Sequence, residues 1–230
     1  MYHKITRKFH VINILLMIGA VAGLIYYDVH GGIFLKGMTS LWFVVIGAVN
    51  LLYGHKTGCK NNVYPRWIAA GLLFGMCADV LLQIEFLLGV AVFALGHLLY
   101  LVAFYAVNKP NKRDLCFVLP IVLVSLFLLL GTPFIQINDA MMRGILVGYA
   151  LIISGMFGKA ASNRYGKKGT FVGLALLGAA MFWFSDLMLA VSLFGKSSRL
   201  VWILCSYTYW PAQSILAYSM FHYITEQTTD

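Results

Sequence analysis

The chain has 230 residues, of which 61% are hydrophobic, 15% aromatic and only 11% charged. Soluble domains carry roughly 25% charged residues, so this composition excludes an ordinary soluble globule. In a soluble protein the net charge of +9 would favour nucleic-acid binding. Here the basic residues fall in short segments between apolar runs, as they do in cytoplasmic loops. We therefore expect an integral membrane protein that binds no nucleic acid.

Eight runs of predominantly apolar residues follow one another along the chain, and a spanning helix needs about 20 such residues. The sequence therefore predicts an all-α polytopic membrane protein, a single domain over residues 1–230 built as a bundle of eight transmembrane helices. The expected helices are 9–27, 32–53, 65–83, 86–107, 115–131, 143–161, 170–194 and 199–223. The first run is longer than the hydrophobic region of a signal peptide, so we expect it to be retained.

Lysine and arginine are unevenly divided between the two sets of connections. Thirteen belong to the N-terminal tail and to the segments 53–66, 107–115 and 159–169. Three belong to the opposite set, namely Arg143, Lys196 and Arg199, and Lys36 lies inside a run. Because basic loops stay in the cytoplasm, both termini are predicted to be cytoplasmic. Such a protein would lie in the inner membrane of a bacterium or in an endoplasmic-reticulum-type membrane of a eukaryote.

Two carboxylates interrupt the third and seventh runs. Asp79 lies within Gly71–Leu82, and Asp186 lies within Leu177–Ala190. An ionised carboxylate in hydrocarbon costs at least a few kcal/mol, so both should face the protein interior. Two buried acids indicate either acid–base chemistry or a proton pathway.

The alternating helix directions and the rise of about 1.5 Å per residue place further polar side chains near the two acids, in the outer half of the membrane. They are Lys36, His97, Tyr100, Tyr207, Tyr209 and Gln213. We expect no comparable polar set in the inner half. For each residue a plainer interpretation is open: Lys36 extending to the interface, His97 bonded to a carbonyl in the core, and the others bonding between helices. Glu85 is expected to cap the outer loop, and Asp28 to be solvated.

Four segments together resemble the YhhN family of membrane proteins, which includes the mammalian lysoplasmalogenases. They are Phe74–Leu82, Phe93–Tyr100, Leu177–Asp186 and Tyr209–Gln213. The likeness covers nearly the whole chain, including the order of the segments. Two positions depart from the family pattern: Gly37 follows Lys36 where proline is frequent, and Ala78 precedes Asp79 where glycine is frequent.

The resemblance implies hydrolysis of the vinyl ether bond of a lysophospholipid, the lysoplasmalogen, to a fatty aldehyde and a glycerophospho-base, with no metal or cofactor. Asp79 and Asp186 would be the acid and the charge stabiliser, in either order, as two carboxylates are in glycosidases. His97 would orient water or tune an aspartate. The expected substrate-binding residues are Lys36, Tyr100, Tyr209, Gln213 and Trp183.

Two other functions fit the same residues. Paired acids with a histidine also suit a proton-coupled transporter, which would need polar access from both membrane faces. A non-catalytic lipid-binding membrane protein would tolerate Asp79→Asn. The head group, the chain length and the oligomeric state are not determined by the sequence.

Overall fold

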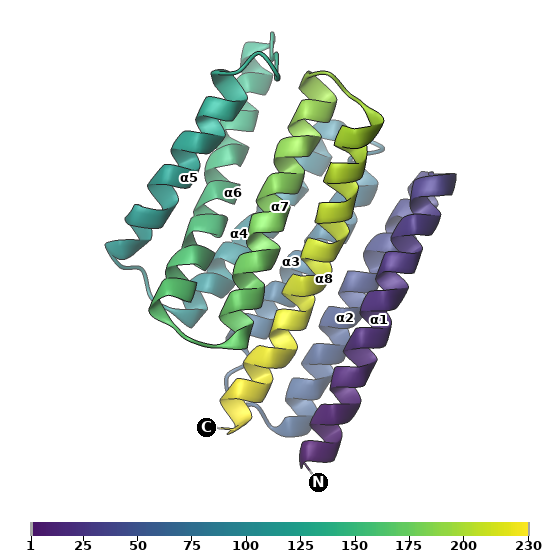
Figure 1. Cartoon of the computed structure of the whole chain (residues 1–230), viewed down its shortest axis with the longest axis vertical. Helices are drawn as coiled ribbons and strands as arrows, with labels where there is room; N and C mark the ends of the chain where they lie inside the picture. The colour runs from purple at the N-terminus through teal and green to yellow at the C-terminus, as the bar shows by residue number, and fades with distance from the viewer. Residues whose placement is uncertain (1, 230) are drawn as a thin grey trace.

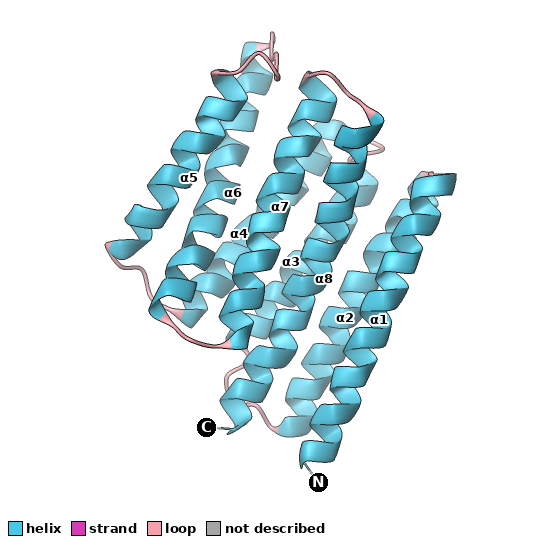
Figure 2. Ribbon diagram, viewed as in Figure 1, coloured by secondary structure: helices cyan, strands magenta, loops and turns pink. Residues whose placement is uncertain are grey.

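The computed structural model describes residues 2–229, and every regular element in that range is a helix (Figures 1 and 2). The helices are α1 (Tyr2–His30), α2 (Ile33–Thr57), α3 (Val63–Leu81), α4 (Phe86–Val107), α5 (Arg113–Leu130), α6 (Ala140–Gly166), α7 (Thr170–Phe194) and α8 (Arg199–Thr229). The prediction of an all-helical chain with eight helices is confirmed for the described residues. α1, α6 and α8 extend beyond their apolar runs, because polar and basic residues continue a helix readily.

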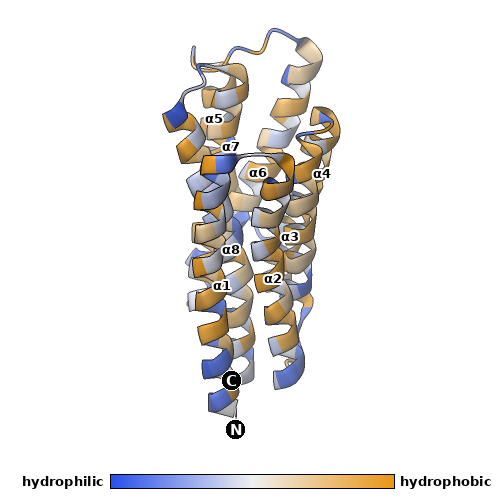
Figure 3. Ribbon diagram, turned by 90° about the vertical axis from the view of Figure 1, so that its right-hand side faces the viewer, coloured by the Kyte–Doolittle hydropathy of each residue, from blue (hydrophilic) through white to orange (hydrophobic). Residues whose placement is uncertain are grey.

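Six helices are long and apolar enough to cross a membrane: α1, α2, α4, α5, α6 and α7. The chain is therefore an integral membrane protein, and the prediction of eight spanning helices is supported for these six. α8 is not one of these six helices. It packs against α7, α2, α1 and α3, and it carries buried polar side chains such as Gln213 and Ser214. A helix enclosed by other helices need not present apolar side chains to lipid. Figure 3 shows hydrophobic residues along the middle of the bundle and hydrophilic ones toward both of its ends.

The N-terminal end of α1 and the C-terminal end of α8 lie at the same end of the bundle (Figure 1). Lys36 is in the first turn of α2, Asp79 is two residues before the end of α3, and Asp186 is eight residues before the end of α7. All three therefore lie in the half of the bundle away from the termini. The polar side chains near the two acids were predicted to lie in this same half.

A second buried polar cluster lies in the half that carries the termini, and the expectation of an apolar inner half was wrong. Lys159 was counted with the basic segment 159–169 although the predicted helix ended at 161; α6 continues to Gly166, and the Lys159 side chain is fully buried. Its Nζ lies 2.9 Å from Asp114 Oδ2, and the Ser162 hydroxyl donates to Asp114 Oδ1 at 2.6 Å. The cluster ties α5 to α6.

Roles were also predicted for Glu85 and Asp28, two acidic residues at the end of the bundle away from the termini. Glu85 caps α4 as expected, since its carboxylate accepts a hydrogen bond from Leu88 N at 2.6 Å. Asp28 is not simply solvated: the Arg199 guanidinium donates to both of its oxygens, at 2.8 and 2.5 Å. This ion pair joins the end of α1 to the start of α8.

Candidate active site

Asp79 from α3 and Asp186 from α7 line the same pocket, which measures about 380 Å³ including the space at its open side. We call it the acid pocket. Its other polar lining residues are Lys36, Ser185, Cys205, Ser206 and Tyr209. Side chains from α2, α3, α4, α7 and α8 thus meet around the two carboxyl groups. The structure brings together the two acids that the sequence singled out, Lys36 and Tyr209.

Asp79 is held by one cation and two hydroxyl groups. Lys36 Nζ lies 3.7 Å from Oδ1, so Lys36 turns into the bundle rather than outward to the interface. The hydroxyl groups of Ser40 and Tyr209 donate to Oδ2 at 2.5 and 2.7 Å. A nearby cation and hydrogen-bond donors both favour the ionised form of a carboxyl group. Asp79 is therefore placed to remain a carboxylate although its side chain is buried.

A chain of hydrogen bonds runs from Tyr100 through Gln213 and Tyr209 to Asp79. Tyr100 OH donates to Gln213 Oε1 at 2.5 Å, and Gln213 Nε2 donates to the Tyr209 hydroxyl oxygen at 3.3 Å. Tyr209 then has its own proton free to donate to Asp79. Tyr209 lines the acid pocket, whereas Tyr100 and Gln213 are not among its lining residues. Their geometry suits positioning of Tyr209 rather than the substrate contact that the sequence suggested.

Gly75 on α3 makes room for this chain of hydrogen bonds. A Cβ atom at this position would lie 2.6 Å from Gln213 Nε2 and 3.6 Å from the Tyr209 hydroxyl oxygen. Gly75→Ala is therefore expected to displace the amide and to lower stability by about 1–3 kcal/mol, the usual effect of overpacking. Thermal unfolding in detergent measures it. Gly155→Ala on α6 is the matched control, because its Cβ would have no described atom within 4 Å; equal unfolding temperatures for the two variants would contradict the prediction.

Asp186 has a different environment. Tyr149 OH donates to its Oδ2 at 2.5 Å, and Ser185 Oγ donates to its Oδ1 at 3.5 Å. His97 Nε2 lies 3.5 Å from Oδ2. Within residues 2–229 no lysine or arginine forms an ion pair with Asp186. Compared with Asp79, this carboxyl group therefore has less to hold it in the ionised form.

His97 is oriented by a backbone carbonyl. Its Nδ1 lies 2.8 Å from the carbonyl oxygen of Phe93, which can only accept a hydrogen bond, so we assign the proton to Nδ1. In the neutral ring Nε2 is then an acceptor, and within the described residues it has no hydrogen-bond partner. Nε2 faces Asp186 and can accept a hydrogen bond from that carboxyl group when it is protonated. His97 is thus both bonded to a carbonyl, as the plainer interpretation held, and adjacent to an acid.

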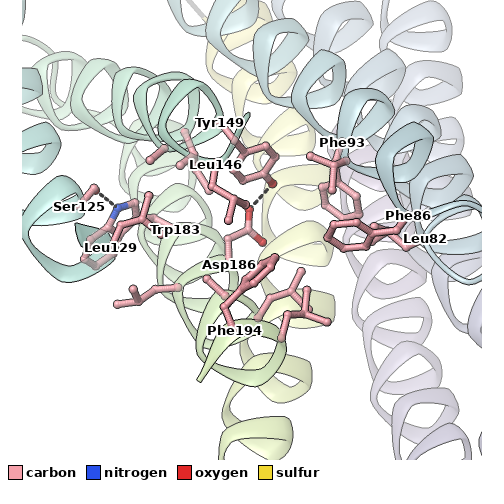
Figure 4. A pocket seen from close by; sticks show the side chains of 17 residues that line it. Leu82, Phe86, Phe93, Ser125, Leu129, Leu146, Tyr149, Trp183, Asp186 and Phe194 are labelled. Atoms are coloured by element: carbon pink, nitrogen blue, oxygen red, sulfur yellow. Dashed lines mark hydrogen bonds between the residues drawn. The ribbon is translucent and has the colours of Figure 1, made fainter. Parts of the chain in front are cut away.

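Figure 4 shows the residues that line a larger apolar pocket, which measures about 740 Å³ including its open side. This pocket adjoins the acid pocket. Its walls come mainly from α4, α5, α6 and α7. Trp183 lines it, with the indole donating to Ser125 Oγ at 2.8 Å. The two pockets share Leu82, Phe93, Asp186 and Leu189. Asp186 therefore lies where the larger apolar pocket meets the acid pocket.

The model of one protein family, the YhhN family, matches residues 32–220. The chain belongs to the YhhN family. The matched range includes both aspartates, His97, Lys36 and the hydrogen-bond chain through Gln213, so the predicted resemblance is confirmed. Comparisons with curated proteins and with solved structures gave no match.

Sequence reasoning missed four residues of this YhhN-family site. Ser40 lies one helical turn after Lys36, and that spacing was a usable signal. Tyr149, Cys205 and Ser206 had no such signal, because only the packing of α6 and α8 brings Tyr149 to Asp186 and the other two to the wall of the acid pocket. Within residues 2–229 no group of three or more His, Cys, Asp or Glu side chains is arranged to hold a metal ion.

Proposed function

We propose that the protein is an intramembrane hydrolase that cleaves the vinyl ether bond of a lysoplasmalogen. The observation that carries the proposal is the pair of carboxyl groups, Asp79 and Asp186, which line one pocket in unlike environments beside a larger apolar pocket. Membership of the YhhN family supports it, because the family includes lysoplasmalogenases. Two acids in unlike environments are what acid catalysis with charge stabilisation requires.

Asp186 is the general acid in this proposal, because it borders the apolar pocket and has no lysine or arginine partner among the described residues. Its proton goes to the alkene carbon that is not bonded to oxygen, and the π electrons of the double bond form the new C–H bond. The other alkene carbon and the ether oxygen then share the positive charge of an oxocarbenium ion. Asp79, held as a carboxylate by Lys36, Ser40 and Tyr209, stabilises that ion, as a carboxylate does in glycosidases.

Water completes the reaction. It adds to the positively charged carbon and returns one proton to Asp186, which restores the acid and leaves a hemiacetal. The hemiacetal collapses to a fatty aldehyde and the glycerol alcohol, so the net reaction adds one water molecule. Before the substrate binds, His97 Nε2, 3.5 Å from Asp186 Oδ2, accepts the hydrogen bond of the protonated carboxyl group, and the same proton is directed to the alkene carbon once the substrate is in place.

The substrate fits the two pockets in one orientation. The alkenyl chain lies in the apolar pocket past Asp186, and the ether oxygen lies between the two acids. The head group then extends along the acid pocket toward Lys36, in the first turn of α2 and near the membrane boundary. The partners are accordingly a one-chain lysophospholipid and the surrounding membrane lipids. We place both termini in the cytoplasm, in the inner membrane of a bacterium or in an endoplasmic-reticulum-type membrane of a eukaryote.

The test is release of fatty aldehyde by the purified protein from a lysoplasmalogen and from its saturated ether analogue. Only the vinyl ether has an alkene carbon that can accept the proton, so only this lipid is expected to give aldehyde. Failure to release aldehyde from the vinyl ether would overturn the proposal. Proton flux in proteoliposomes without aldehyde release would favour the transporter.

A further inference from the structure

The hydroxyl group of Ser206 is buried and has no hydrogen-bond partner among residues 2–229. Within the described residues only three buried side-chain atoms lack a hydrogen bond: His97 Nε2, Asn163 Oδ1 and Ser206 Oγ. Ser206 is 2% exposed and lines the acid pocket. Leaving a buried polar group unsatisfied costs about 1–3 kcal/mol. A ligand that forms the missing hydrogen bond would recover that free energy.

Other serines on the same helix do not share this feature. Ser214 donates to the carbonyl oxygen of Trp210 at 3.0 Å, and Ser219 donates to that of Leu216 at 2.6 Å. A serine inside a helix usually finds such a carbonyl one turn back. Ser206 is therefore the exception on α8, and it is also the one of these three that lines the acid pocket.

The neighbouring polar groups of the acid pocket already have partners. Asp79 contacts Lys36, Ser40 and Tyr209, while Asp186 contacts Tyr149 and Ser185. The hydroxyl group of Ser206 remains available both to donate and to accept one hydrogen bond. It lies one helical turn before Tyr209, which binds Asp79. A ligand whose reacting atoms lie between the acids would bring its adjacent atoms near this hydroxyl group.

We propose that Ser206 is a specificity-determining residue that binds the free hydroxyl group of the glycerol in a one-chain vinyl ether lipid. The inference rests on the proposed function, which places the ether oxygen between Asp79 and Asp186. In such a lipid the free hydroxyl is on the carbon next to the one that carries the ether, so it enters the same pocket. A two-chain lipid has an acylated oxygen there, which cannot donate a hydrogen bond and carries a second chain. Ser206 thus selects the one-chain form.

The experiment pairs a change in the protein with a change in the substrate. The wild-type enzyme is given the one-chain vinyl ether lipid and an analogue with hydrogen in place of the glycerol hydroxyl. The analogue is expected to have a kcat/KM about tenfold lower, the upper part of the range for one net hydrogen bond. In Ser206→Ala the two substrates should differ by less than about twofold. Ser214→Ala, which alters a bonded serine of the same helix, should keep the tenfold ratio.

Binding distinguishes failure of this inference from failure of the proposed function. The saturated one-chain ether lipid and its analogue without the hydroxyl group are titrated into wild-type and Ser206→Ala protein, because neither lipid can be hydrolysed. Discrimination that disappears in Ser206→Ala supports the role of Ser206 even if no vinyl ether is cleaved. Aldehyde release with equal kcat/KM for both substrates in the wild-type enzyme, or a tenfold ratio retained in Ser206→Ala, would overturn it and leave the hydrolase intact.

Discussion

Asp186→Asn is expected to lower the turnover of a vinyl ether lipid by about 10²–10⁴-fold, the range that general acid catalysis contributes. Asparagine has nearly the same shape, and its side-chain oxygen can still accept the hydrogen bond that Tyr149 donates. It has no proton that it can give to carbon. The loss should therefore appear in kcat, while KM and the unfolding temperature stay close to those of the wild-type protein. Aldehyde release and a thermal melt on the same preparation measure both.

Asp28→Asn is the matched control for this change. Asp28 is an acid near the same end of the bundle, but it bonds to Arg199 and lines neither pocket. Its replacement should leave turnover within about threefold, because Asp28 contacts neither of the two acids and lines neither pocket. If Asp186→Asn instead retained near wild-type turnover, Asp186 would not be the acid, and the proton would have to come from another group.

The meeting of the two acids could be predicted from helix direction. Asp79 lies near the end of its run and Asp186 toward the end of its own, and both runs point the same way through the membrane. Helical rise then fixes depth to within a turn or so. Depth does not fix the side of the helix that a residue occupies, so the partners Tyr149 and Ser206 could not be identified. That side is set by how α6 and α8 pack against α7.

Lys159 shows where the reasoning about loops fails. A lysine beside an apolar run resembles the start of a loop, and hydropathy alone cannot show that the helix continues for two more turns. Asp114, in the first turn of the preceding helix α5, supplies the buried partner that makes a charged residue tolerable at that depth. A single sequence contains both residues but gives no sign that they meet. The same holds for Tyr100 and Gln213, where only the structure shows the shared hydrogen bond to be directed toward Tyr209.

Lys36→Met is expected to lower both stability and kcat. Removing one partner of a buried ion pair typically costs about 3–5 kcal/mol, because the other charge stays buried without compensation. Here that charge is on Asp79, and the Lys36 and Asp79 side chains are only 9% and 3% exposed. Without the ammonium group Asp79 will tend to become protonated, and a neutral acid cannot stabilise the oxocarbenium ion. Lys196→Met, at an exposed loop lysine, should change neither quantity.

The double variant Lys36→Met/Asp79→Asn separates the ion pair from the head-group role that the sequence also suggested for Lys36. If the main effect of Lys36→Met is an unpaired Asp79, removing that charge as well should raise the unfolding temperature back toward the wild-type value. Turnover should stay low, because the double variant has no charge stabiliser. A Lys36→Met protein with unchanged stability, unchanged kcat and a raised KM would contradict this expectation. That result would assign Lys36 to the phosphate of the substrate alone, since loss of uniform binding raises KM without affecting kcat.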